Sequence, residues 1–262
     1  MVIPRDAASV IIIRNAPEGG RVEVLMVRRT ARASFVPNVY VFPGGSIDKE
    51  DCSHQMKRYC KGLDLNKLSH LIPDLKPPEK VMGAYVAALR ETFEEVGILV
   101  AYEEHGRLIS LNTPEKRVRF MNYRRALNEG KIKFSEILER QRLTLAMERL
   151  YYFSHWITPE LSPIRFSVRF FVTEAPGFQE GSHDGQELTD HRWIAPGEAL
   201  RLNGEGSFDM VLPTIVNLTE LEKFKTAEEV IESTRKKRVL SVLSKLKIID
   251  GRYVEVLPEN ME

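Results

Sequence analysis

The distribution of apolar and polar positions predicts a mixed sheet with helices between its strands. Two β-branched runs at 8–15 and 22–29 flank a turn-rich segment, so we expect them to pair as strands. A third run at 39–45 is interrupted by Pro43 and two glycines. Further strands are expected at 98–104, 151–159 and 165–176, with a strand that leads into a helix at 188–202 and a small hairpin at 248–258.

Helical periodicity marks much of the remaining chain. The strongest pattern is 79–97, which stops at Gly97, a residue suited to a helix C-terminus. The segment 114–149 is rich in Leu, Arg and Glu and predicts two or three helices. Amphipathic helices are also expected at 213–224 and 227–246. Between the third strand and the long helix, a polar stretch predicts a mostly helical insertion with a proline-rich exit.

Composition and charge narrow the class of protein. The 262-residue chain is 43% hydrophobic and 29% charged, as in an ordinary globular protein, and it can bury a sizeable core. Its 38 Lys and Arg nearly balance its 37 Asp and Glu, so no overall field favours nucleic acid or a membrane as a partner. No apolar run approaches the length of a transmembrane helix.

The chain ends and the cysteines lead us to expect a cytoplasmic protein. The first residues lack the pattern of a signal peptide, and the last three do not form a peroxisomal targeting tripeptide. Two cysteines, Cys52 and Cys60, are too few for a disulfide framework. Together with His54 and His70 they fit no common structural zinc spacing, so free thiols are the simpler expectation.

Candidate chemistry is concentrated at the end of the long helix. Glu91, Glu94 and Glu95 lie within one turn, and residues three and four apart share a helix face. Like charges at this spacing cost about 0.2–0.5 kcal/mol per pair, and the negative end of the helix dipole adds to that cost. A divalent cation would reverse the penalty, since Mg²⁺ prefers a few carboxylates with water and phosphate oxygens. The alternative is a solvated face, which charge runs commonly form.

The residues around this turn resemble the signature of the Nudix hydrolases, which cleave diphosphates linked to another moiety. In that signature a glycine loop leads into a helix with the order Arg-Glu-aliphatic-x-Glu-Glu-x-Gly-aliphatic. The matching positions here are Gly44, Gly45, Arg90, Glu91, Glu94, Glu95, Gly97 and Ile98. The later stretch "ELTDHRWIAPGEAL" resembles a family strand in which a Glu six positions before a Trp is a further metal ligand, and that position is Glu187.

Departures from the signature point to one branch of the family. An insertion at 46–80 separates the glycine loop from the helix, and Met82 stands where the signature has a glutamate. Thr92 also fills an aliphatic position. A branch with a long insertion at this place includes a coenzyme A diphosphatase of animal peroxisomes. The stretches "FVPNVYVFPGGSID", "AALRETFEEVGIL" and "SHWITPELSPIRFSVRFFV" are similar to it.

The resemblance implies a fold and a reaction. We expect one Nudix domain over 1–262, an α/β/α sandwich with a mixed sheet, helical elaborations at 46–80 and 114–150, and a C-terminal helical extension at 213–262. The implied reaction is hydrolysis of a diphosphate bond in a nucleoside diphosphate derivative, dependent on Mg²⁺ or Mn²⁺. The expected substrate is coenzyme A or acyl-CoA, giving phosphopantetheine and adenosine 3′,5′-bisphosphate. An ADP-ribose or dinucleotide pyrophosphatase, or a non-hydrolytic nucleotide-binding module, is the alternative.

Residue roles follow from the same resemblance. The general base is expected to be Glu91, with Glu187 and Glu180 as rivals on one loop. Arg90 would hold the helix glutamates in register through charge-assisted hydrogen bonds. The implied metal ligands are Glu91, Glu94, Glu95, Glu187 and the carbonyl of Gly44.

Substrate and partner contacts must come from elsewhere in the chain. Arg28, Arg29 and Arg32 are candidates to pair with phosphate groups, or they form a solvated strand end. His155 beside Trp156 is more typical of a packed core pair than of a catalytic one. The small-molecule substrate is the expected partner, and the extra helices are compatible with a homodimer.

Overall fold

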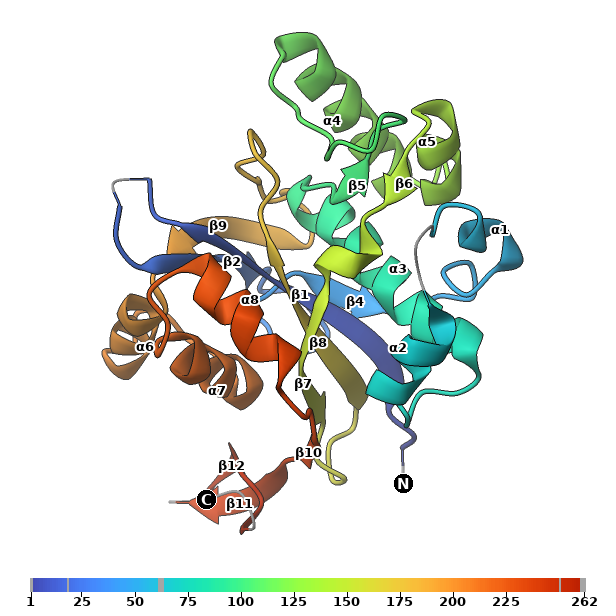
Figure 1. Ribbon diagram of the computed structural model, residues 1–262. Helices are drawn as coiled ribbons and strands as arrows, with labels where there is room; N and C mark the ends of the chain where they lie inside the picture. Colours follow the sequence, from blue (N-terminus) through green and yellow to red (C-terminus); the bar gives the residue numbers. More distant parts are fainter. Residues whose placement is uncertain (1, 18, 61–63, 250, 260–262) are drawn as a thin grey trace.

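A central mixed sheet dominates the computed structural model (Figure 1). The structure describes residues 2–17, 19–60, 64–249 and 251–259. The strands of this sheet are β1 (Arg5–Asn15), β2 (Val22–Arg29), β3 (Tyr40–Val41), β4 (Gly44–Ser46), β7 (Tyr151–Ile157), β8 (Phe166–Glu174), β9 (Leu188–Ile194) and β10 (Ser241–Leu243). Their order is β10-β7-β8-β1-β2-β3, with β4 also paired to β1 and β9 to β2. The β1–β8 and β7–β10 pairs are parallel, and β1–β2 and β7–β8 are antiparallel.

Each face of the sheet is covered by its own group of helices. Successive strand residues point to opposite faces, so β1 sends Val10 and Ile12 into one hydrophobic cluster and Ile11 and Ile13 into another. The first cluster includes residues of α3 (Pro78–Val96), α4 (Pro114–Asn128) and α5 (Phe134–Arg140). The second includes residues of α6 (Pro196–Gly204), α7 (Leu212–Leu221) and α8 (Ala227–Arg235). The predicted α/β/α sandwich with a mixed sheet is therefore confirmed.

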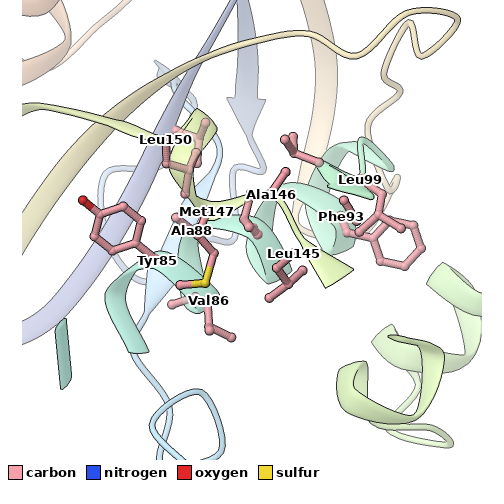
Figure 2. Packing of buried hydrophobic residues seen from close by; sticks show 14 of the residues in the cluster. Tyr85, Val86, Ala88, Phe93, Leu99, Leu145, Ala146, Met147 and Leu150 are labelled. Carbon is pink, nitrogen blue, oxygen red and sulfur yellow. The ribbon is translucent and has the colours of Figure 1, made fainter. Parts of the chain in front are cut away.

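The long helix α3 packs against the sheet through its buried residues. Pro78 begins it, and Gly97 ends it with a left-handed φ of 71°, from which its N–H donates to the Phe93 carbonyl at 3.0 Å. Figure 2 shows Tyr85 and Ala88 of α3 among the buried side chains of a passing segment that contains Leu145, Met147 and Leu150. That segment comprises β6 (Thr144–Leu145) and a short 3₁₀ helix, Met147–Arg149. The anchored helix fixes the position of the glutamates on its last turn.

Two predicted elements differ from the structure. The expected strand at 98–104 is reduced to β5 (Ala101–Tyr102), which pairs with β6. The Leu99 backbone instead bonds to the side-chain amide of Gln179. The expected helix at 227–246 ends at Arg235, because the chain then adds β10 to the edge of the sheet and buries Val242 there.

The insertion contains less helix than predicted, and the C-terminal extension is helical only in its first part. The insertion holds α1 (His54–Lys57) and α2 (Leu65–Leu71), and an irregular stretch begins it. The extension follows its two helices with β10 and the predicted hairpin, β11 (Lys245–Ile249) and β12 (Arg252–Val256). The prediction of a helical extension over 213–262 is therefore wrong beyond Arg235, where β10, β11 and β12 follow. Nothing in the described part of the chain combines the helix length and the hydrophobicity that a membrane-spanning segment requires.

Candidate active site

Arg90 makes several ion pairs at the acidic turn, which is the last turn of α3 and carries Glu91, Glu94 and Glu95. Its guanidinium donates through Nε and Nη2 to both carboxylate oxygens of Asp51, each at 2.9 Å. Its Nη1 donates to Glu91 at 2.9 Å and to Glu94 at 2.8 Å. Burial alone would lower the pKa of Arg90, but the bond to Asp51 and the charges of Glu91 and Glu94 outweigh it and raise that pKa. The predicted role of Arg90 as the residue that orders the glutamates fits this geometry.

Two residues that contact the acidic turn or Arg90, Asp51 and Arg124, were not predicted from the sequence. Asp51 lies in the insertion and is 2% exposed, and nothing in its spacing from Arg90 marks it as a partner. Arg124 of α4 donates to the main-chain carbonyls of Glu94 at 2.8 Å and of Glu95. It thereby supplies a cation and donors to the C-terminal carbonyls of α3, where the helix dipole is negative. The two elaborations of the fold both brace the acidic turn.

Glu95 contacts the glycine corner, formed by Gly44 and Gly45, rather than Arg90. Its carboxylate accepts a hydrogen bond from the N–H of Gly44 at 2.8 Å, and its side chain is buried. Gly45 approaches Glu91 so closely that a Cβ built on it would lie 2.3 Å from Oε1. The glycine corner and the acidic turn, separated by the insertion in the chain, are thus in direct contact.

Replacing either glycine by alanine should have different consequences. In Gly45→Ala the new methyl meets the carboxylate end of the Glu91 side chain rather than main-chain atoms, so the carboxylate is displaced and the fold is retained. In Gly44→Ala the methyl meets main-chain atoms of Ala8 and Ser9 at 2.4 and 2.6 Å, which cannot move away cheaply. We expect Gly45→Ala to reduce hydrolysis about tenfold or more with a near-normal melting temperature, and Gly44→Ala to lose about 1–3 kcal/mol of stability. Equal melting temperatures and equal activities for both variants would contradict this reading.

A cavity of about 470 Å³ joins these groups. The glycine corner and the acidic turn line one part of it, and Arg29 and Glu187 lie there as well. Apolar side chains of β7 and β8 line the remainder, together with residues after α6 and at the C-terminal hairpin. A cavity of this size with a few charged groups at one end is typical of a small-molecule site.

Ionisation of the three glutamates of the acidic turn is costly in this cavity, as their raised pKa values indicate. Burial, opposed by Arg90 and assisted by Glu94, raises the pKa of Glu91 to about 7. Burial and the charge of Glu91 raise the pKa of Glu95 well above its usual range. Burial is also the main reason that the pKa of Glu94 is raised. One arginine in contact with two of the carboxylates does not offset the cost of confining all three.

The donor set fits a hard divalent cation, although it is not already arranged around one. Within the described ranges, no three His, Cys, Asp or Glu side chains converge in a ready-made metal site. Arg90 instead draws Glu91 and Glu94 to its own nitrogens. The available ligands are nevertheless carboxylate oxygens that share one cavity and raise each other's pKa, and these are the ligands that Mg²⁺ and Mn²⁺ take.

The structure separates the three arginines that the sequence offered for substrate binding. Arg29 lines the cavity, and its charge acts on Glu95. Arg28 is exposed and donates to the Asn38 carbonyl at 3.4 Å, and Arg32 is exposed. Alternation along β2 explains the division, because Arg29 follows the parity of Leu25 and Val27, which face α3. This placement keeps Arg29 as a candidate for substrate binding, and it fits the alternative of a solvated strand end for Arg28 and Arg32.

The structure also locates the other candidate residues, Glu187, Glu180 and His155. Glu187 lines the cavity, and its charge raises the pKa of Glu95, so it lies near the acidic turn. Glu180 is exposed and pairs with Arg14 at 2.8 Å, outside the cavity lining. His155 is buried between the hydroxyls of Ser167 and Ser241 at 2.8 and 2.7 Å, in keeping with a packed position.

The cysteines of the insertion serve its packing. Cys60 is buried and its thiol donates to the Met56 carbonyl at 3.2 Å. Cys52 lies against α3, where its sulfur would be 2.3 Å from a Cβ at Gly83. Gly83 therefore allows the insertion to approach the helix that carries the glutamates.

The fold and the glycine-glutamate cavity define a Nudix domain. A family profile described as the NUDT19 Nudix domain matches residues 4–221, and the chain belongs to that family. It is 28% identical over 211 residues to acyl-coenzyme A diphosphatase NUDT19 of Xenopus laevis, covering 68% of this chain and 54% of the relative. It is 26% identical over 224 residues to putative nudix hydrolase 7 of Caenorhabditis elegans, covering 84% and 61%.

A solved structure agrees with the fold. The Nudix hydrolase of Alicyclobacillus acidocaldarius shares 27% identity and a TM-score of 0.69, covering 88% of this chain and 97% of that one. By contrast, the chain spans only 54% and 61% of the two curated relatives above. The similarity therefore establishes the domain and its fold.

Proposed function

We propose that this protein is a divalent-metal-dependent diphosphohydrolase, acting on coenzyme A or acyl-CoA to give phosphopantetheine and adenosine 3′,5′-bisphosphate. The observation that carries the proposal is one cavity in which Glu91, Glu94 and Glu95 meet the glycine corner beside Arg29. An anionic diphosphate cannot approach these carboxylates alone, because like charges repel. A cation between the two would satisfy both.

The ligands of the divalent ion, Mg²⁺ or Mn²⁺, would be Glu91, Glu94, Glu95 and Glu187, with the carbonyl of Gly44. When bound, the ion neutralises the diphosphate oxygens and lowers the pKa of water. Arg90, fixed by Asp51, positions Glu91 and Glu94, both of which line the cavity. We assign the general base to Glu91, which lines the cavity next to the glycine corner, and keep Glu187 as its rival.

Arg29 is the proposed contact to the diphosphate. Its Nε is buried and makes no hydrogen bond within the described part of the chain, although it lines the cavity. A buried guanidinium donor without a partner is costly, and a phosphate oxygen is a suitable acceptor. The similarity to an acyl-coenzyme A diphosphatase favours a coenzyme A substrate over ADP-ribose or a dinucleotide.

A substrate panel tests the proposal. The purified protein would be given coenzyme A, an acyl-CoA, ADP-ribose and a dinucleoside polyphosphate, each with Mg²⁺ and with Mn²⁺, and products would be identified by mass. We expect phosphopantetheine or its acyl form from the first two, and no turnover with a chelator present. Preferred turnover of ADP-ribose or the dinucleotide would reassign the substrate. Tight nucleotide binding without products would indicate a binding module.

Binding of the cation should be readable in stability as well as in turnover. Glu91 and Glu95 have a raised pKa in the folded protein, so their neutral forms favour folding and this contribution is lost as the pH rises toward and beyond about 7. A metal needs the deprotonated forms and should restore stability there. We expect Mg²⁺ to raise the melting temperature by several degrees at pH 8 and by little at pH 5.5. An equal shift at both pH values would argue against binding by these carboxylates.

A further inference from the structure

The cavity extends well beyond the acidic turn. Its far part is floored by alternate residues of β8, namely Phe166, Val168 and Phe170, which share one face of the sheet. Trp156 of the neighbouring strand β7 lies beside them and is 4% exposed. Phe35, from the loop before β3, packs edge-on against Phe166 with ring centres 5.1 Å apart. It also lines the cavity. The far part is therefore mainly apolar.

The C-terminal segment closes the far part. Strand β10 pairs with β7, and Val242 lies opposite Trp156. Ser244, which follows β10 and is 2% exposed, donates its hydroxyl proton to the Glu255 carboxylate of β12, and its oxygen lies 3.3 Å from the Ile157 carbonyl oxygen. Ser244 and Glu255 both line the cavity. Figure 1 shows the hairpin β11–β12, which contains Glu255, at the opposite end of the sheet from α4.

The charges in the cavity lining distinguish its two parts. Arg29 is the one basic residue among the described lining residues, and it lies with the glutamates. The far part carries Glu255, whose pKa is raised by burial. An anionic phosphate would find no positive partner there and would meet a carboxylate. An uncharged chain with N–H or O–H donors would find apolar walls and the acceptor oxygens of Glu255 and Ser244.

We propose that Ser244 and Glu255, in the C-terminal segment that begins at β10, form a specificity element that binds the uncharged, amide-bearing arm of the substrate. Glu255 accepts a hydrogen bond from that arm, and Ser244 fixes its carboxylate. The segment lies beyond residues 4–221, the range that the family profile matches. The inference rests on the proposed function, and it orients the substrate with its phosphorylated nucleoside outside the far part of the cavity.

The two product halves of coenzyme A allow a direct test. Binding of phosphopantetheine and of adenosine 3′,5′-bisphosphate would be measured separately by calorimetry with Mg²⁺, for the native protein, Glu255→Gln and Glu259→Gln. Glu259 is an exposed carboxylate three residues beyond the end of the hairpin and serves as the charge-matched control. We expect Glu255→Gln to weaken phosphopantetheine binding about tenfold and to leave the bisphosphate within about twofold, since a charge-assisted hydrogen bond to a carboxylate is replaced by a weaker one to a neutral amide. Glu259→Gln should change neither.

The outcomes separate this inference from the proposed function. Coenzyme A hydrolysis with unchanged phosphopantetheine binding in Glu255→Gln would overturn the inference alone. Weaker binding of the bisphosphate instead would reverse the orientation and also overturn it. Absence of hydrolysis, with phosphopantetheine binding that depends on Glu255, would overturn the proposed function and support the specificity element. A melting temperature for each variant shows that the hairpin is intact.

Discussion

Glu94→Gln should reduce diphosphate hydrolysis about a hundredfold or more while leaving the fold in place. Glu94 is partly exposed and lines the cavity. Because an amide has nearly the same volume as a carboxylate, the substitution should not disturb the packing. The substitution replaces a carboxylate that would ligate the cation, and that accepts a charge-assisted hydrogen bond from Arg90, with a neutral amide. Loss of an outer contact of a metal site alone costs about 10–100-fold, and a ligand should cost at least the upper value.

The matched control for Glu94→Gln is Glu79→Gln. Glu79 is an exposed glutamate in the first turn of the same helix, far along α3 from the cavity. The measurements are turnover at saturating substrate and the dependence of the rate on Mg²⁺ concentration. We expect the control to behave as the native protein. If Glu94→Gln and Glu79→Gln had equal rates, the acidic turn would perform no chemistry.

Asp51→Asn should both destabilise the protein and reduce its activity. The native carboxylate makes two hydrogen bonds to Arg90, and both side chains are largely buried. Removing one partner of such a pair costs about 3–5 kcal/mol, because the other charge stays buried. The two glutamates still bound to Arg90 offset part of that cost, so we expect about 2–3 kcal/mol. Because Arg90 would then hold Glu91 and Glu94 less firmly, turnover should fall about 10–100-fold.

Asp48→Asn is the control for the aspartate. Asp48 belongs to the same segment and lies 3.6 Å from Arg90, but its side chain is 67% exposed. Exposed pairs contribute roughly 0–1 kcal/mol, so thermal unfolding and turnover should change little. The Mg²⁺ concentration needed for half-maximal rate distinguishes a positioning role from general destabilisation. That concentration should rise for Asp51→Asn at a temperature where the variant is fully folded. Identical profiles for the two variants would show that Asp51 does not position the glutamates.

Local patterns predicted local structure well. The spacing of Glu91, Glu94 and Glu95 placed them on one turn, because helix periodicity depends on neighbours in the chain. The stop at Gly97 was also predicted, and its φ of 71° explains why glycine stands there. The contact between Gly45 and Glu91 is different, since it spans the insertion. Only the resemblance to the Nudix signature anticipated it.

Long-range competition explains what the sequence alone did not reveal. The segment 227–246 has helical periodicity throughout, but an open edge of the sheet offers Val242 main-chain hydrogen bonds and a buried site. Such tertiary pairing outweighs helix propensities of less than about 1 kcal/mol per residue. Similarly, the sequence did not indicate which of the arginines near the end of β2 would line the cavity. The alternation of the strand in the folded sheet selected Arg29.

The amino-acid sequence by itself determined the class of fold, the acidic turn and the family signature, because these depend on periodicity and on residue types at short spacing. The tertiary structure alone decided which distant groups complete the site. Asp51 from the insertion and Arg124 from α4 brace the glutamates, and Ser244 and Glu255 close the far end of the cavity. No local pattern marks these residues, because their effect arises only when packing brings buried charges and acceptors within hydrogen-bonding distance.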